Sequence, residues 1–201
     1  MGNISKNNTI DYYNNNAKSY FENTLKANMD FLYKKFLNYL PDKKKITILD
    51  VGSGSGRDSL YFLQKGYSVV ALEPSEELVK MSRKIIGDII VIKYIEDISY
   101  SNIFDGVWAC ASLLHIPHKL MNNILKKLYQ SLKDDGILFI SLKKGDFEGV
   151  RNKRYFCDYT LDKFNKLSYK KIGFKLVEHF ETFDVRKDRN NELWLNLILK
   201  K

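Results

Sequence analysis

The sequence predicts an α/β fold in which a doubly wound, mainly parallel sheet carries helices on both faces. Short apolar runs alternate with stretches of helical periodicity along most of the chain. The runs are almost continuously apolar, as expected of parallel strands that are buried on both faces. A third observation is a glycine-rich loop between one such run and the helix that follows it, at the edge where these sheets bind ligands.

The N-terminal part is expected to cover this core. Residues 1–16 are polar and rich in Asn, which predicts a segment that is loosely ordered until another part of the molecule covers it. Apolar side chains then recur mostly four residues apart from Ala17 to Leu40, which predicts one amphipathic helix ended by Pro41.

The core and the C-terminal part follow in order. Strands are expected at Ile46–Val51, Tyr67–Leu72, Ile89–Ile95, Asp105–Ala111, Ile137–Leu142, Phe174–Phe183 and Glu192–Leu199, the last two as an antiparallel hairpin joined by residues 184–191. Helices are expected at Asp58–Lys65, after Pro74 with Ser75 as N-cap, after Pro117, and at Thr160–Ile172, while residues 144–158 form a long loop. No linker divides the chain, so one domain is expected over residues 1–201, made of an N-terminal lid and helix (1–45), a central core (46–142) and a C-terminal part (143–201).

The composition narrows the class of protein. The formal net charge is +9, but residues 46–116 hold nine acidic and six basic side chains. An acidic middle between basic flanks favours a cationic ligand in the middle and an anion or water at the ends. The sequence has no signal peptide and no apolar run long enough for a membrane span, so a cytoplasmic protein is expected. Cys110, Cys157 and three histidines are too few and too scattered to predict a disulfide framework or a metal site.

The glycine loop reads Asp50-Val51-Gly52-Ser53-Gly54-Ser55-Gly56. Glycines let the backbone pass close to a ligand. The dinucleotide fingerprint would need a third glycine at position 57, where this chain has Arg57. A carboxylate at Asp50 would repel a pyrophosphate, but it would attract a ligand with an ammonium and a sulfonium group.

Further acids follow the next two predicted strands. Glu73 ends the second strand, where a carboxylate can accept hydrogen bonds from both ribose hydroxyls. Asp97 and Ile98 follow the third strand and offer an acid for an adenine amino group and an apolar face for its ring.

With these motifs, residues 46–142 resemble the class I S-adenosylmethionine-dependent methyltransferases. The Phe104-Asp105-Gly106-Val107-Trp108 strand and the Leu132-Lys133-Asp134-Asp135-Gly136 turn belong to the same resemblance. It implies a Rossmann-like, seven-stranded sheet with an antiparallel last strand, and S-adenosylmethionine as cofactor, released as S-adenosylhomocysteine. The cofactor-binding residues that it implies are Asp50, Gly52, Ser53, Gly54 and Gly56 at the methionine part, Glu73 and Pro74 at the ribose, and Asp97 and Ile98 at the adenine.

The transfer centre is expected just after the fourth strand. Ala109 would leave room for the cofactor, and His115 is either a general base or substrate contact or a structural histidine at the helix entrance. The segment 12–20 resembles the N-terminal cover of small-molecule methyltransferases, with Tyr12 and Tyr20 closing over the cofactor. Cations and aromatic residues of the C-terminal part are candidates for binding an anionic or aromatic acceptor, namely Arg154, Tyr155, Arg186 and Trp194.

The leading functional hypothesis is a methyltransferase that acts by direct displacement on a small-molecule acceptor. The alternatives are an RNA methyltransferase that uses the basic, aromatic flanks, and a non-catalytic module that only binds the cofactor. The motifs of DNA methyltransferases are absent from the sequence, and neither a DNA nor a membrane partner is expected. The identity of the acceptor, its accepting atom and the oligomeric state stay open.

Overall fold

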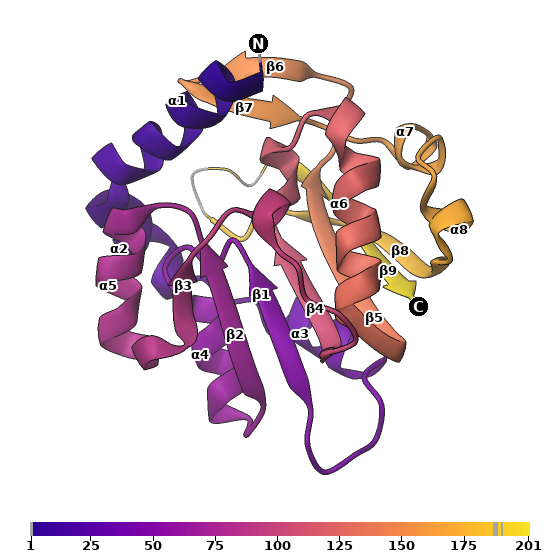
Figure 1. The fold of residues 1–201 in the computed structure, drawn as a ribbon. Coiled ribbons are helices and arrows are strands. Elements are labelled where there is room, and N and C mark those ends of the chain that lie inside the picture. The colour runs from indigo at the N-terminus through magenta and orange to yellow at the C-terminus, as the bar shows by residue number, and fades with distance from the viewer. Residues whose placement is uncertain (1, 187–188, 190) are drawn as a thin grey trace.

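The computed structural model describes residues 2–186, 189 and 191–201, and its centre is one seven-stranded sheet (Figure 1). The strands of this sheet are β1 (Thr47–Val51), β2 (Ser68–Glu73), β3 (Ile90–Ile92), β4 (Phe104–Cys110), β5 (Leu132–Lys143), β8 (Lys175–Phe183) and β9 (Leu193–Lys200). Their order is β3-β2-β1-β4-β5-β9-β8, and only β9 runs antiparallel to its neighbours. The predicted Rossmann-like fold with an antiparallel last strand is confirmed.

Helices cover both faces of the sheet (Figure 1). They are α1 (Gly2–Asn15), α2 (Ala17–Leu25), α3 (Asp30–Leu37), α4 (Arg57–Gln64), α5 (Glu76–Ile86), α6 (His118–Ser131), α7 (Leu161–Asn165) and α8 (Tyr169–Ile172), with 3-10 turns η1 (Gly87–Ile89), η2 (Ile95–Asp97) and η3 (Leu113–His115). The face behind the sheet in Figure 1 packs on α3, α4 and α5, whereas the front face packs on α6, α7 and α8. Alternate residues of β1 serve the two cores, since Ile48 faces α3 and Leu49 faces α6.

The strand order reverses between β1 and β4, and the carboxyl ends of both strands lie at the upper edge of the sheet in Figure 1. Ligands of open α/β sheets bind at this switch point. The next helices start there as the sequence predicts: Ser75 Oγ caps α5 by accepting from the amide of Leu78 at 3.3 Å. Thr160 caps α7 in the same way, through the amide of Lys163 at 3.2 Å.

Two predictions for the N-terminal part need correction. Residues 1–16 were expected to be loosely ordered until another part of the molecule covers them. Here they include α1, which occupies Gly2–Asn15, lies along the upper edge (Figure 1) and is bound to β7 (Arg154–Cys157) and α5. Helix α1 is stabilised by tertiary contacts with segments that are distant in the sequence, and sequence periodicity does not predict such contacts. The single helix expected over Ala17–Leu40 is two helices, because Asn28 Oδ1 accepts from the amide of Asp30 at 2.9 Å and starts α3 anew.

Three later predictions also need correction. The strand expected at Ile89–Ile95 is only Ile90–Ile92, with 3-10 turns on either side. The helix expected at Thr160–Ile172 is the pair α7 and α8. The long loop contains a hairpin, β6 (Glu148–Arg151) and β7 (Arg154–Cys157), whose turn residues Asn152 and Lys153 have φ of 48° and 64°. Two successive positive φ values match the turn twist that closes two-residue hairpins.

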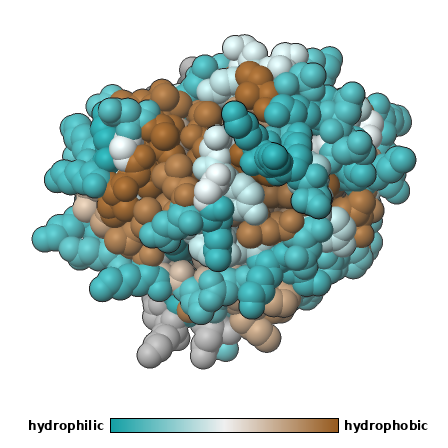
Figure 2. Space-filling view, turned by 90° about the horizontal axis from the view of Figure 1, so that it is seen from below, coloured by the Kyte–Doolittle hydropathy of each residue, from teal (hydrophilic) through white to brown (hydrophobic). Residues whose placement is uncertain are grey.

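The opposite edge of the sheet, where the parallel strands begin, is covered mostly by hydrophilic residues with several hydrophobic patches among them (Figure 2). Within the described part of the chain, no helix combines the length and the apolar character that crossing a bilayer requires.

Candidate active site

Two neighbouring cavities open at the upper edge of the sheet. The first, here the glycine-loop cavity, has a volume of about 340 Å³ and lies between the glycine loop, the end of β2, η2, η3 and α1. The second, here the basic cavity, has a volume of about 250 Å³ and lies between α1, the β6–β7 hairpin and the β8–β9 connection. Tyr13, Tyr20, Ala111 and His115 line both cavities and form the wall between them.

Two glycines of the loop have backbone conformations that disfavour any other residue. Gly52 and Gly54 have φ of +73° and +53°, which side chains other than glycine rarely adopt. A Cβ at Gly52 would lie 2.5 Å from Cβ of Ser112, and one at Gly54 would lie 3.1 Å from Cε1 of Tyr20. Both glycines line the glycine-loop cavity, so their backbone faces this cavity without an intervening side chain.

Glu73 lies at the end of β2 and lines the glycine-loop cavity. Its Oε2 accepts from the amide of Gly54 and its Oε1 from the amide of Ser75, both at 2.9 Å. A carboxylate has about four lone-pair sites, so each oxygen can accept one further hydrogen bond. Burial of the side chain, which is 5% exposed as a residue, raises the pKa of Glu73 to about 7.

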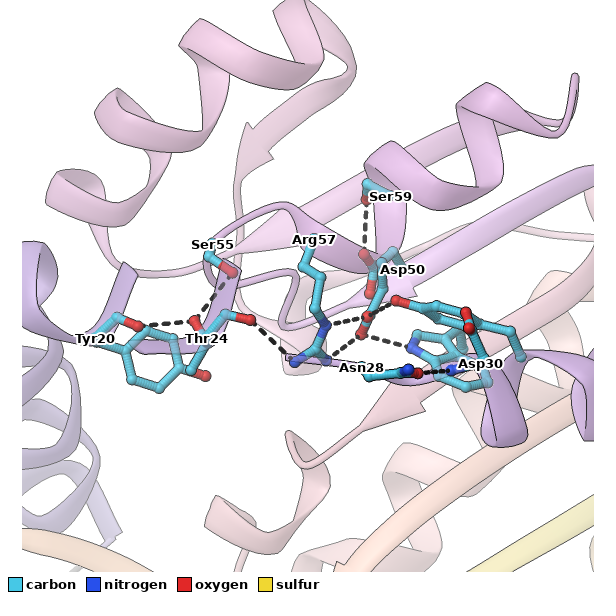
Figure 3. Close-up of polar contacts among 11 residues, drawn as sticks. Tyr20, Thr24, Asn28, Asp30, Asp50, Ser55, Arg57 and Ser59 are labelled. Atoms are coloured by element: carbon cyan, nitrogen blue, oxygen red, sulfur yellow. Dashed lines mark hydrogen bonds and ion pairs between the residues drawn. The ribbon is translucent and has the colours of Figure 1, made fainter. Parts of the chain in front are cut away.

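Asp50 lies beneath the loop instead of in the cavity. It is 1% exposed, and Ser59 Oγ donates to its Oδ2 at 2.6 Å (Figure 3). Burial, followed by the neighbouring charge of Asp58, raises the pKa of Asp50 to about 8. Burial thus favours the neutral form of both carboxyls, and a cationic ligand bound nearby would favour their ionised forms.

A buried network supports the loop from below (Figure 3). Arg57 donates to Asp58 through Nε at 2.6 Å and Nη2 at 3.0 Å, and the Tyr33 hydroxyl and Trp108 Nε1 donate to the same carboxylate at 2.5 and 2.9 Å. Burial by itself would raise the pKa of Asp58, but Arg57 and these donors hold it below its ordinary value. Asp58 is thus a fixed negative charge at the start of α4.

The same region fixes helix α2 to the loop (Figure 3). Thr24 Oγ1 donates to the Tyr20 carbonyl at 2.7 Å and lies 3.0 Å from Ser55 Oγ, while Arg57 Nη1 donates to the Thr24 carbonyl at 3.4 Å. These contacts seat the ring of Tyr20 on Gly54. One ring of the wall between the cavities is therefore held by the loop itself.

His115 and Tyr13 form the other half of that wall. His115 Nδ1 lies 2.6 Å from the Tyr155 carbonyl, and because a carbonyl oxygen only accepts, Nδ1 carries the proton. Nε2 then accepts from the Tyr13 hydroxyl at 2.8 Å. Burial, reinforced by the charge of Arg154, lowers the pKa of His115 to about 4, so the ring is neutral at pH 7.

Helix α1 lies along the upper edge of the sheet (Figure 1), where Thr9, Ile10 and Tyr13 line the glycine-loop cavity and Tyr13 also lines the basic cavity. The amide of Tyr155 on β7 donates to Thr9 Oγ1 at 2.9 Å, and at the other end of α1 Ser75 Oγ donates to Asn14 Oδ1 at 2.7 Å. The helix therefore bridges the hairpin and the start of α5. This bridge is what orders the segment that sequence alone predicts to be loose.

The sequence-predicted cofactor residues fall into two groups. Gly52, Gly54, Glu73, Pro74 and Tyr20 line the glycine-loop cavity. The others lie around it: Asp50 beneath the loop, Ser53 at a smaller cavity behind Tyr20, Gly56 against Ser82 and Ile86, Asp97 at the end of η2, Ile98 and Ala109 in the core, and Tyr12 under Arg154.

Some lining residues escaped the sequence reasoning because of local backbone geometry. Turn η2 brings Ile95 and Glu96 to the cavity in place of the following two residues. Ala111, with φ of 54°, lines the cavity, whereas Ala109 is inside β4. Tyr13 could have been found in the segment 12–20 that was already singled out, since it lies directly next to Tyr12. The rings of Tyr13 and Tyr20 are 5.1 Å apart.

The predicted substrate residues gather around the basic cavity. Arg154, Arg186 and Trp194 line it, and Tyr155 contributes the carbonyl that holds His115. The hydroxyl of Tyr155 is turned to Glu148 at 2.5 Å. In the described residues, no group of three or more histidine, cysteine or acidic side chains is arranged to hold a metal ion.

Comparisons with known proteins place the chain in a family. Residues 25–186 match the model of the methyltransferase domain, so the chain belongs to this family. A relative described as an uncharacterized methyltransferase of Staphylococcus carnosus (strain TM300) is 25% identical over 166 residues, which is 82% of this chain and 77% of the relative.

Solved structures agree on the fold. A methyltransferase from Methanosarcina mazei, described as dependent on S-adenosylmethionine, superposes with a TM-score of 0.70 at 18% identity, covering 84% of this chain and 97% of its own. The 1,6-didemethyltoxoflavin N1-methyltransferase of Burkholderia thailandensis, solved with its acceptor and S-adenosylhomocysteine, gives 0.64 at 22% identity and covers 79% and 72%. The chain is an S-adenosylmethionine-dependent methyltransferase, as the sequence resemblance implies.

Proposed function

We propose that this enzyme methylates a small-molecule acceptor held in the basic cavity, with the cofactor in the glycine-loop cavity. The observation that carries the proposal is the wall that the two cavities share, made of Tyr13, Tyr20, Ala111 and His115. A methyl group that passes from one cavity to the other must cross this wall, so these residues meet both reactants.

The residues of the glycine-loop cavity fit the cofactor. The volume of about 340 Å³ lies in the range of about 300–1,000 Å³ that ligand sites occupy. Glu73 retains acceptor capacity for two ribose hydroxyls, and Ser112 Oγ is a buried polar atom with no hydrogen-bond partner among the described residues. We assign Glu73 and Pro74 to the ribose, Gly52, Gly54 and Ser112 to the methionine part, and Ile95, Glu96 and Leu78 to the adenine.

Bound S-adenosylmethionine supplies an activated methyl group on a sulfonium. The acceptor atom forms its bond to that carbon as the carbon–sulfur bond breaks and sulfur keeps the electron pair. This chain's residues align the acceptor, exclude water and take up a proton. Helix α1 contributes to this exclusion at the glycine-loop cavity and the hairpin at the basic cavity, since each lines that cavity.

Tyr13 and His115 form a proton route at the wall. The Tyr13 hydroxyl already donates to His115 Nε2, so a proton received by the Tyr13 oxygen can be passed to that nitrogen. With a pKa of about 4, His115 is a weak base. It therefore takes the proton as the new bond forms and the acceptor atom becomes acidic, without deprotonating the free acceptor.

The size of the basic cavity favours a small molecule over RNA. The hairpin lines this cavity, and a volume of about 250 Å³ suits one compact acceptor. RNA methylation would need a base and its backbone to enter from an open basic groove.

The test uses cofactor with a deuterated methyl group. The purified chain is incubated separately with a small-molecule extract and with total RNA, and label is followed by mass spectrometry. Label in the small-molecule fraction is the expected result. Label in RNA alone would overturn the proposal, and label in neither fraction would overturn methyl transfer to either class.

A further inference from the structure

The basic cavity contains one buried cation that stands apart from the others. Three of its lining cations have carboxylate partners in the structure. Lys143 pairs with Glu192 at 2.8 Å, Arg151 with Asp158 at 2.6 Å, and Arg186 with Asp184 at 2.5 Å. Arg154 has no carboxylate partner among the described residues, although it is only 8% exposed.

The surroundings of Arg154 fix its position without neutralising its charge. Its guanidinium lies 4.4 Å from the ring centroid of Tyr12 and 5.0 Å from that of Phe156. Nη1 donates to the Tyr13 hydroxyl at 3.5 Å, and Nε is buried with no hydrogen-bond partner. A buried cation that lacks an anionic partner is strongly destabilising, and such a group is found where a ligand completes it.

The side chains around Arg154 indicate what kind of anion would bind to it. Tyr13, Tyr20, Phe156 and Trp194 line the cavity, and aromatic rings pack best on planar ligands. Among the described residues, Lys143, Arg151 and Arg186 have carboxylate partners, and Arg189 has contacts of its own. Arg154 is therefore the lining cation that is left to bind an anion. One planar guanidinium matches a monoanionic carboxylate, whereas a phosphate dianion would leave a second charge unmatched.

We infer that the methyl acceptor is a planar, aromatic carboxylic acid whose carboxylate binds Arg154 in the basic cavity. The inference rests on the proposed function and specifies its substrate class. Arg154 also contacts Tyr13, which in turn reaches His115. A carboxylate bound to Arg154 would therefore hold the acceptor next to Tyr13, the first residue of the proton route to His115.

The cofactor is a competing source of carboxylate, through its methionine part. The position of Arg154 argues against it, because Arg154 lines the basic cavity and Tyr13 separates it from the glycine-loop cavity. The experiment distinguishes the two sources by measuring the affinities of S-adenosylhomocysteine and of an acceptor probe separately.

The test is isothermal titration of the full chain saturated with S-adenosylhomocysteine, using para-hydroxybenzoate and its neutral analogue para-hydroxybenzamide as probes. We expect the wild type to bind the acid about 10-fold or more tightly than the amide, the preference that one charge-assisted contact gives. Arg154→Met should bring the two affinities within about twofold of each other, and Arg154→Lys should give an intermediate ratio. Lys143→Met removes one positive charge from the same cavity and should keep most of the preference.

Three results would overturn the inference. They are equal binding of acid and amide to the wild type, an equal loss of preference in Lys143→Met, and a loss of S-adenosylhomocysteine affinity in Arg154→Met as large as the loss for the acid. The last result would assign Arg154 to the cofactor's carboxylate. The probes need no turnover, so a failure here leaves the label-transfer test of the proposed function standing.

Discussion

The two cavities share a wall but differ in charge and in the segments that build them. The glycine-loop cavity is lined mainly by the segments that follow β1, β2, β3 and β4, with Glu73 in its wall and Asp50 buried beneath the loop. The basic cavity is assembled from α1, the hairpin and the β8–β9 connection, which are far apart in sequence. The difference teaches that one half of the site is a property of the fold, while the other half depends on segments that meet only through tertiary contacts.

The largest expected effect concerns the foundation of the glycine loop. Asp58→Asn removes the carboxylate that Arg57, Tyr33 and Trp108 share, and leaves the half-buried Arg57 without its ion-pair partner. We expect a loss of about 3–5 kcal/mol in the free energy of unfolding, measured by urea denaturation. Glu77→Gln, at an exposed ion pair on α5, is the control and should change it by about 0.5 kcal/mol or less. Equal stability of the two variants would show that the loop does not depend on this network.

The wall itself is tested by His115→Gln. Loss of the proton acceptor should lower kcat by about 100-fold, the lower end of the usual contribution of general base catalysis. The affinity for S-adenosylhomocysteine should stay close to that of the wild type, because the wall contributes to transfer more than to cofactor binding. Tyr13→Phe breaks the same route and should have a similar effect. An unchanged kcat in both variants would show that Tyr13 and His115 have a structural role and do not transfer the proton.

The Glu73→Gln variant tests the glycine-loop cavity independently of the basic cavity. It weakens the acceptor for the ribose hydroxyls and should lower the affinity for S-adenosylhomocysteine by about 10- to 100-fold, since a hydrogen bond to a charged group is lost. Calorimetry measures the change, with Glu77→Gln as the matched control on the neighbouring helix. If the affinity is unaltered, the glycine-loop cavity is not the cofactor site.

A pair of glycine variants measures how much the contact between the glycine loop and Ser112 contributes to stability. Gly52→Ala and Gly66→Ala both force a side chain on a positive φ, +73° and +85°. Only at Gly52 does the new Cβ also meet another atom, Cβ of Ser112 at 2.5 Å, while none lies within 4 Å at Gly66. Gly52→Ala should therefore be less stable than Gly66→Ala by about 1–3 kcal/mol in chemical denaturation. Equal losses would mean that the backbone, and not contact with Ser112, demands glycine.

The smallest effect is a pH dependence of stability. His115 has a pKa of about 4 in the folded chain, below its ordinary value of about 6.5, so the unfolded chain binds an extra proton between these values. Its contribution to stability is complete above about pH 6.5 and is lost as the pH falls toward 4. The stability difference between wild type and His115→Gln should shrink by roughly 1–2 kcal/mol from pH 7.5 to pH 5. A constant difference would mean that His115 takes up its proton as readily in the folded state.

The sequence by itself predicted the order of the sheet and several residues that line the glycine-loop cavity, namely Gly52, Gly54, Glu73 and Pro74. Strand runs, glycines and acids that are close in the chain, such as Asp50, Gly54 and Glu73, are brought together by any parallel sheet of this order, because strand ends meet at one edge. The tertiary structure decided the rest. Helix α1 forms because Thr9 and Asn14 find partners on β7 and α5, and only this places Tyr13 against His115 and Arg154 above the basic cavity. Contacts between residues separated by more than one hundred positions leave no periodic signal in the chain, so only the folded molecule reveals them.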